Sequence, residues 1–186
     1  ERNITYLHKQ KWQTIKASQL RPGNIIYLQK NDVVPIDGIL IGKYKCFQTR
    51  TLNPIVKISL SQINGETTQI AKNVVDSKIT VLELVNKYKS QLSILDYGGK
   101  QLDKFTGYLY LYNQIINNNI NENINNFENI KITGNNFIPS GSIIKSKHAV
   151  LLVTSCGNDK KCGIQKKNII YKSNEIDTLV GKYMIE

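Results

Sequence analysis

The chain has 186 residues, of which 40% are hydrophobic and 21% charged, and this balance suits one folded domain with a real core rather than a disordered chain. No stretch approaches the roughly 18 to 20 consecutive apolar residues of a membrane-spanning helix, and residues 1–12 are too polar for a signal peptide. The net charge of +11 comes from 22 Lys and 3 Arg scattered along the chain, whereas base readout depends on Arg, so the charge favours a solvated Lys-rich surface over nucleic-acid binding. We therefore expect a soluble chain, which does not exclude an origin in a larger membrane protein.

Short apolar runs separated by turn residues predict strands in the first half of the chain, at residues 25–28, 39–41 and 55–60. Pro35 has no amide hydrogen for a sheet ladder, so it predicts a strand edge, a bulge or a strand start. Residues 79–88 are ambiguous, because Leu82 and Val85 recur at helical spacing while the β-branched content favours a strand.

The second half adds further strands, which we predict at residues 105–112, 130–132 and 149–154. Along the first of these, Tyr108, Tyr110 and Tyr112 alternate with Leu109 and Leu111, which places the two residue types on opposite faces. Residues 113–129 are Asn-rich and of low complexity, so we predict a mobile insertion loop there. Residues 173–186 have the signals of a helix start, with Ser173 or Asn174 as the N-cap. The whole chain, 1–186, is predicted to be one mainly β (α+β) domain with a helical end.

The three cysteines, Cys46, Cys156 and Cys162, are an odd number without zinc-ligand spacing, so we expect reduced thiols and no metal site. With two His and no G-x-S-x-G or C-x-x-C motif, the sequence offers little for nucleophilic catalysis.

Three blocks of sequence carry a resemblance when they are taken together and in order. The first is Arg-Pro-Gly-Asn at residues 21–24, followed by Pro-Ile-Asp-Gly at residues 35–38. The second is Asn64-Gly65-Glu66-Thr67 within residues 61–68, and the third is residues 143–161, which end in Cys-Gly-Asn-Asp-Lys-Lys. These blocks resemble the actuator domain of P-type ATPases over nearly the whole chain.

Within that family, the chain is most similar to the phospholipid-flippase (P4) branch. Thr67 follows the flippase form of the loop, and residues 97–107 resemble the segment that leads into Phe-Thr-Gly in flippases, which ion pumps lack. Two departures stand out. Asn64 replaces the flippase aspartate, and Thr68-Gln69 replaces the usual Asn-Leu.

The resemblance implies a distorted jelly-roll-like actuator domain with short flanking helices and a hydrolysis loop. In the family, ATP phosphorylates an aspartate on a separate domain, and the actuator loop then hydrolyses that acyl phosphate. Glu66 would position the attacking water and take its proton, because an ionised carboxylate can do both. Gly65 would let the backbone approach the phosphoryl group, and the Thr67 hydroxyl would fix the loop or a phosphate oxygen. Asn64 and Thr68 would shape the loop, while Pro35, Asp37 and Gly38 would form a structural turn.

We expect no catalysis from this domain alone, because it has no Asp-Lys-Thr-Gly phosphorylation motif and no glycine-rich nucleotide loop. The resemblance implies no cofactor in this domain and ATP with Mg²⁺ in the parent protein. Its implied partners are the phosphorylation and nucleotide-binding domains of the same polypeptide. The resemblance also allows an accessory subunit as a partner. The parent would be an integral membrane protein, with this domain on the cytoplasmic side and residues 1 and 186 toward the bilayer.

Two alternatives remain open on the sequence. The altered loop and the Asn-rich insertion also fit a flippase-like regulatory module fused to a guanylyl cyclase. A basic β domain that binds nucleic acid is the second alternative, and it predicts tight binding with a steep salt dependence.

Overall fold

The computed structural model is organised around a six-stranded antiparallel sheet, and it describes residues 2–43, 53–76, 78, 80–86, 88–96, 104–113 and 127–160. The strands follow the spatial order β10-β4-β12-β3-β1-β2. Their bounds are β1 (Asn3–His8), β2 (Lys11–Lys16), β3 (Ile25–Gln29), β4 (Asp37–Gly42), β10 (Phe137–Ile138) and β12 (His148–Ser155).

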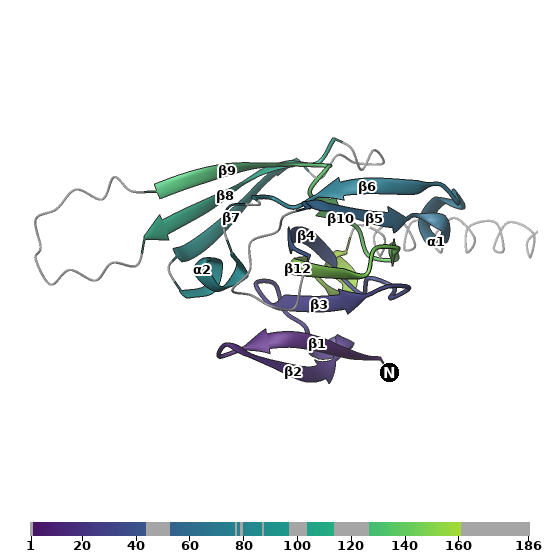
Figure 1. Cartoon of the computed structure of the whole chain (residues 1–186), viewed down its shortest axis with the longest axis horizontal. Coiled ribbons are helices and arrows are strands. Elements are labelled where there is room, and N and C mark those ends of the chain that lie inside the picture. The colour runs from purple at the N-terminus through teal and green to yellow at the C-terminus, as the bar shows by residue number, and fades with distance from the viewer. Residues whose placement is uncertain are drawn as a thin grey trace, which may run out of the picture.

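Two three-stranded antiparallel sheets complete the fold (Figure 1). The first has the order β11-β5-β6, with β5 (Ile55–Ser59), β6 (Gln69–Asn73) and β11 (Ile143–Ile144). The second has the order β7-β8-β9, with β7 (Tyr88–Asp96), β8 (Thr106–Asn113) and β9 (Phe127–Thr133). The described helical segments are short: α1 (Ser61–Asn64), α2 (Val81–Asn86), η1 (Ala17–Gln19) and η3 (Gly157–Asp159). None of the helices in these described ranges is long and apolar enough to cross a membrane.

The six-stranded sheet is apolar on both faces, and each face builds its own core. Ile26 and Leu28 point into a first core with Val56 and Ile58 of β5, whereas Ile25 joins a second core that includes Leu109 of β8. This division follows from the period of two in a strand, which sends neighbouring side chains to opposite faces. Phe105 and Phe137, both fully buried, stack in the second core with ring centroids 4.3 Å apart. The mainly β fold predicted from the sequence is confirmed, with the central sheet covered on both sides.

The predicted strands are confirmed with bounds that differ by one to three residues: they correspond to β3, β4, β5, β8, β9 and β12. The expected faces of β8 are also correct, since Leu109 and Leu111 are buried while Tyr108 and Tyr110 are half-buried. The hairpin β1–β2 and the strand β6 are additional elements that the sequence did not predict.

The ambiguous segment, residues 79–88, contains the helix α2 and the first residue of β7. Thr80 and Glu83 form a reciprocal cap: the Glu83 backbone N–H donates to Thr80 Oγ1 at 3.1 Å, and the Thr80 N–H donates to Glu83 Oε2 at 2.8 Å. A Thr-x-x-Glu capping box satisfies two backbone donors that a helix start otherwise leaves open. Hydrophobic periodicity does not detect this capping box, which explains why residues 81–86 form a helix rather than a strand.

The range predicted for the insertion loop, residues 113–129, extends into a strand at each end. Asn113 belongs to β8, and β9 begins at Phe127 rather than after Asn129. Asn129 pairs with Tyr110 and is exposed, so this polar side chain sits in a strand without being buried. Residues 114–126 and the predicted helical tail, 173–186, lie outside the described residues.

Candidate functional site

The segment that carries Glu66 connects β5 to β6 through one helical turn. After β5 the chain passes through buried Leu60 into α1, where the backbone N–H of Ile63 donates to the Leu60 carbonyl at 2.8 Å. Gly65 then ends the turn in the left-handed conformation, at φ 80°, and its N–H donates to the Ser61 carbonyl at 3.2 Å. Glycine favours this position because a side chain is strained at positive φ. The sequence Asn64-Gly65 therefore ends the helix and releases the chain into the loop.

A local hydrogen bond shapes the loop in front of Glu66. Asn64 Oδ1 accepts the backbone N–H of Glu66 at 3.1 Å, as Asx side chains do in turns. Asn64 was expected to shape the loop, and this hydrogen bond is the contact through which its side chain does so. The loop thus has a defined start although Asn64, Gly65 and Glu66 are all exposed.

The predicted loop residues protrude together from one end of the β5–β6 pair, where α1 lies (Figure 1). Residues 64–68 are all exposed, and a Cβ added at Gly65 would meet nothing within 4 Å. A site buried inside the domain would not have this form. An exposed loop of this kind is accessible to a group that approaches from outside the domain.

Pro35, Asp37 and Gly38 were predicted to form a structural turn, and the structure places them differently. Asp37 and Gly38 are the first residues of β4, and only Pro35 precedes the strand. The Asp37 side chain is fully buried, where Oδ1 accepts the Ser140 N–H at 2.7 Å and Oδ2 accepts the Ser155 hydroxyl at 3.1 Å. Gly38 is needed for packing, because a Cβ there would lie 2.9 Å from the Leu152 carbonyl oxygen. These residues serve the sheet, and Asp37 ties β4 to two distant segments.

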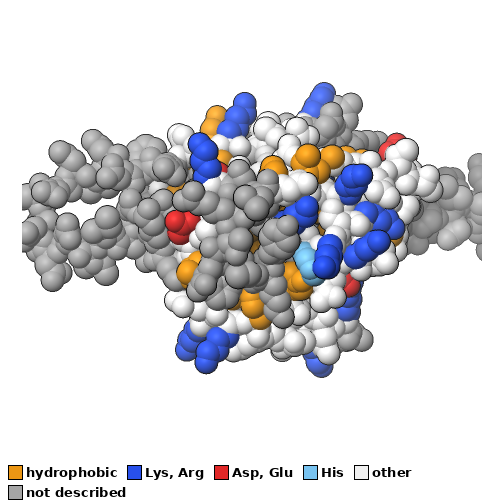
Figure 2. All heavy atoms as spheres, in the orientation of Figure 1, with side chains coloured by type: hydrophobic (Ala, Val, Ile, Leu, Met, Phe, Trp, Pro, Cys, Tyr) orange, Lys and Arg blue, Asp and Glu red, His pale blue; other side chains and the backbone are white. Residues whose placement is uncertain are grey.

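The described surface has few acidic groups. In the space-filling view, Lys and Arg side chains are spread over the face shown and Asp or Glu side chains are sparse (Figure 2). Arg2 and Asp32 form one ion pair on the described surface, with Arg2 Nη2 2.6 Å from Asp32 Oδ1. A basic domain of this kind attracts anionic partners without specifying them.

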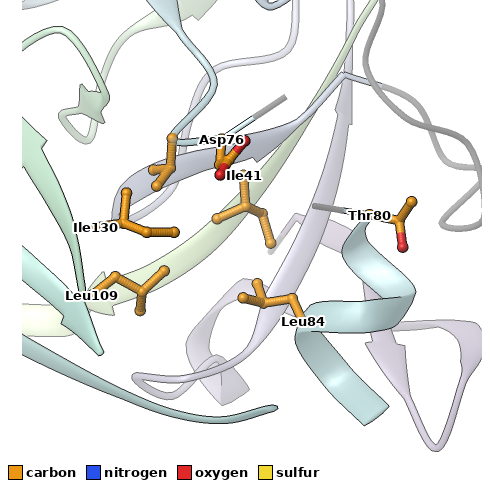
Figure 3. Close-up of a pocket in the computed structure, with 7 residues that line it drawn as sticks. Ile41, Asp76, Thr80, Leu84, Leu109 and Ile130 are labelled. Atoms are coloured by element: carbon orange, nitrogen blue, oxygen red, sulfur yellow. The ribbon is translucent and has the colours of Figure 1, made fainter. Parts of the chain in front are cut away.

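A small pocket among the described residues lies apart from the loop. It has a volume of about 20 Å³, lies between β4, α2 and the β8–β9 pair, and is lined by none of residues 64–68. Ile41, Leu84, Leu109 and Ile130 project into it, with Asp76 and Thr80 as its polar members (Figure 3). Its volume suits about one water molecule, so it is a packing gap rather than a binding site.

No group of three or more His, Cys, Asp or Glu comes together within the described ranges, and Cys156 is a free thiol there. Cys46 and Cys162 lie outside them.

Sequence reasoning missed the residues beneath the loop. Ile63 packs against the first core, and it lies over Gly141, which follows Ser140. The Ser-Gly-Ser sequence at residues 140–142 is a turn signal, yet nothing in the sequence alone connects it to residue 63.

Comparisons with known proteins identify the family and the fold of the chain. The family model of the P-type ATPase actuator domain matches residues 1–167. A crystal structure of a zinc-transporting PIB-type ATPase is similar, with a TM-score of 0.50 and 14% identity over 93% of this chain and 17% of that chain. A second crystal structure of a zinc-transporting PIB-type ATPase, in another state, gives a TM-score of 0.47 and 13% identity over 89% of this chain and 16% of that chain. The chain therefore spans less than a fifth of the length of these proteins, and their likeness concerns the fold alone. No curated protein sequence matches the chain. Because the family model covers most of its length, this chain belongs to the P-type ATPase actuator-domain family.

Proposed function

We propose that this domain serves an ATP-driven phospholipid translocase, where it hydrolyses the aspartyl-phosphate intermediate and couples that step to movement of membrane helices. The observation that supports this proposal best is the exposed loop after α1, in which Gly65 is left-handed and Glu66 follows a turn closed by Asn64. The chain belongs to the actuator-domain family, and the resemblance of Gly65-Glu66-Thr67 to the hydrolysis loop of that family supports the hydrolytic role.

The chemistry assigned to Glu66 follows from its exposure and its turn. An ionised carboxylate can hold a water in line with the phosphorus and accept its proton as the new P–O bond forms. The leaving carboxylate is the aspartate of the phosphorylated domain, so one acyl phosphate and one water give phosphate and a free aspartate. Gly65 presents only backbone to the phosphoryl group, and Thr67 offers a hydroxyl one residue beyond the base.

The domain needs other parts of the parent protein for this reaction. The phosphorylated aspartate, ATP and Mg²⁺ would all belong to the phosphorylation and nucleotide-binding domains of the same polypeptide. The parent would be an integral membrane protein, and this domain would work on its cytoplasmic side, with an accessory subunit as a further partner.

The assignment to phospholipid transport comes from two features of the sequence. Thr67 matches the flippase form of the loop, and Phe105-Thr106-Gly107 matches the flippase segment absent from ion pumps. In this structure Phe105 stacks on Phe137, and a Cβ at Gly107 would lie 2.7 Å from the Ser93 carbonyl oxygen. Phe105 thus packs in the second core just before β8, and Gly107 allows β7 to approach the start of β8 closely.

The hydrolytic role is tested by Glu66→Gln in the full-length protein. Loss of the carboxylate removes the base, so we expect phosphoenzyme to accumulate and its decay to slow by roughly 100-fold or more, within the range of a lost general base. Gln62→Ala changes an exposed residue of α1 and keeps the carboxylate, so its decay rate should match that of the wild type. Equal decay rates in Glu66→Gln and the wild type would remove the hydrolytic role.

The transported substrate needs a separate test, since a structurally similar ATPase is zinc-transporting. We expect phospholipids, and not Zn²⁺, to stimulate ATP hydrolysis by the purified full-length protein in detergent. Stimulation by Zn²⁺ alone would replace the flippase assignment while leaving the actuator role intact.

The cyclase-linked alternative keeps the same fold and differs in the parent protein. A guanylyl cyclase sequence in the remainder of the parent polypeptide would favour it, and an intact phosphorylation motif together with phospholipid-stimulated ATP hydrolysis would favour transport.

A further inference from the structure

The helix that carries the loop is too short to hold its own position. α1 has four residues, and its last hydrogen bonds run from Asn64 N to Leu60 O at 3.1 Å and from Gly65 N to Ser61 O at 3.2 Å. A single helical turn is unstable by itself, because nucleation fixes several residues for one or two hydrogen bonds. Contacts with the rest of the domain must therefore decide where α1 ends and where Glu66 begins.

Ile63 makes such a contact. Between residues 62 and 69 it is half-buried while the other residues are exposed, and it packs against the first core. It lies directly over Gly141: a Cβ built on that glycine would be 3.3 Å from Ile63 Cγ1 and 3.8 Å from Cδ1. Glycine at position 141 thus leaves the room that the Ile63 side chain occupies.

The turn beneath Ile63, residues 139–142, is held firmly in place. The Ser140 N–H donates to buried Asp37 Oδ1 at 2.7 Å, the Gly141 N–H donates to the Val34 carbonyl at 2.9 Å, and the Ser142 hydroxyl donates to the Pro139 carbonyl at 2.7 Å. Ser140 and Ser142 are only 6% and 0% exposed. A turn with this many buried hydrogen bonds resists displacement, so it can serve as a fixed support.

We propose that Gly141 and Ile63 are positioning residues, and that the turn at residues 139–142, anchored by Asp37, is the platform that sets the direction of the Glu66 loop. The kinetic consequence rests on the proposed hydrolytic function, whereas the mechanical support of α1 does not. A Cβ at residue 141 would push Ile63 by a few tenths of an ångström, and α1 would move with it because every other residue between 62 and 69 is exposed.

The chain supplies a matched control for this substitution. Gly141 and Gly23 have nearly equal left-handed φ angles, +89° and +88°, but a Cβ at Gly23 would meet nothing within 4 Å. Gly141→Ala and Gly23→Ala therefore carry the same kind of backbone strain, and only the first meets the loop helix. In the full-length protein we expect both to lower the thermal midpoint similarly. Amide hydrogen exchange of residues 60–68 should be faster in Gly141→Ala than in the wild type, and unchanged in Gly23→Ala.

Phosphoenzyme kinetics provide the functional readout. We expect decay in Gly141→Ala to be roughly tenfold slower than in Gly23→Ala, because small misplacements of a reacting group are costly, while phosphoenzyme formation is unchanged. Ile63→Ala should slow decay as well by removing the support. The double variant Gly141→Ala with Ile63→Ala should be no slower than Ile63→Ala alone, since the added methyl then enters vacated space.

Unchanged exchange of residues 60–68 in Gly141→Ala would overturn the platform, and so would additive effects in the double variant. A different pair of results would separate the two proposals. If amide exchange of residues 60–68 is faster in Gly141→Ala but phosphoenzyme decay in Glu66→Gln is normal, the support of α1 is upheld and the hydrolytic function is rejected.

Discussion

Asn64 Oδ1 accepts the backbone N–H of Glu66 at 3.1 Å, so the residue that departs from the flippase pattern still closes the turn in front of the glutamate. An aspartate at position 64 has an oxygen in the same place. We therefore expect Asn64→Asp to keep phosphoenzyme decay within about threefold of the wild type, whereas Asn64→Ala should slow it by roughly two- to tenfold, the worth of one net hydrogen bond. Rapid-quench measurement of phosphoenzyme decay in the full-length protein checks both. If Asn64→Ala decays like the wild type, the hydrogen bond has no part in placing Glu66.

Asp37 is the anchor of the turn at residues 139–142, and its loss should be costly. Asp37→Ala leaves the Ser140 N–H and the Ser155 hydroxyl without their acceptor in a buried setting, so we expect a loss of about 2–4 kcal/mol in the free energy of unfolding. Asp37→Asn keeps one acceptor and should lose less. Urea unfolding of the 186-residue chain measures the loss, and Asp159→Ala, at an exposed carboxylate, should stay within about 0.5 kcal/mol of the wild type.

Thr80 caps α2, and its hydroxyl both accepts from the Glu83 N–H and donates to the Glu83 carboxylate at 2.9 Å. Removing it by Thr80→Ala should reduce the free energy of unfolding by about 1 kcal/mol, as typical for an N-cap. Thr80→Ser retains the hydroxyl and is the matched control. An equal loss in both variants would mean that packing of the Thr80 methyl group, and not capping, decides the effect.

His148 should make stability depend on pH. Its Nδ1 contacts the Tyr27 hydroxyl, and burial together with the positive charge of Lys147 lowers the pKa of His148 below its usual 6.5. Burial and the Asp32 carboxylate raise the pKa of Tyr27, so the phenol stays protonated and can donate to the neutral imidazole. Well above pH 6.5 the folded and unfolded states both hold a neutral imidazole. As the pH falls below 6.5, the unfolded state takes up the proton first, so the folded state loses relative stability until the pH reaches the lowered pKa.

Urea unfolding between about pH 7.5 and about pH 5 measures this loss. His148→Gln should flatten the profile relative to the wild type, and His8→Gln, which changes an exposed histidine, should leave the slope in place. A wild-type profile without a decline below pH 6.5 would contradict the role of His148.

The strands of the central sheet could be predicted because their side chains are apolar in runs. Residues 25–28 and 149–153 are buried on both faces of the sheet, and continuous apolar runs of that length are typical of such strands. Glu66 could be identified only through its place in a family motif, since an exposed glutamate on a turn has no physical signature of its own.

The hairpin β1–β2 shows why some strands could not be predicted from the sequence. Its two-residue turn is Lys9-Gln10, with φ angles of 45° and 62°, and two-residue hairpins with positive φ at both positions are usually built from Asn-Gly or Asp-Gly. Its second strand, β2, is largely polar and exposed, so neither the turn nor the pattern indicated a hairpin. The contact between Ile63 and Gly141 could not be predicted for a different reason. These residues are 78 positions apart in the sequence, and only the folded chain brings them together.

The ladder between β8 and β9 has an evolutionary consequence. Tyr112 pairs with Phe127, so the chain leaves and re-enters the sheet at neighbouring positions whatever lies between them. The entropy of closing such a segment grows only with the logarithm of its length, about 0.6 kcal/mol for each doubling. Expansion or contraction of the asparagine tract by a few codons would therefore change the stability of the domain very little. The pairing of Tyr112 with Phe127 thus separates the length of the polar stretch between them from the stability of the rest of the domain.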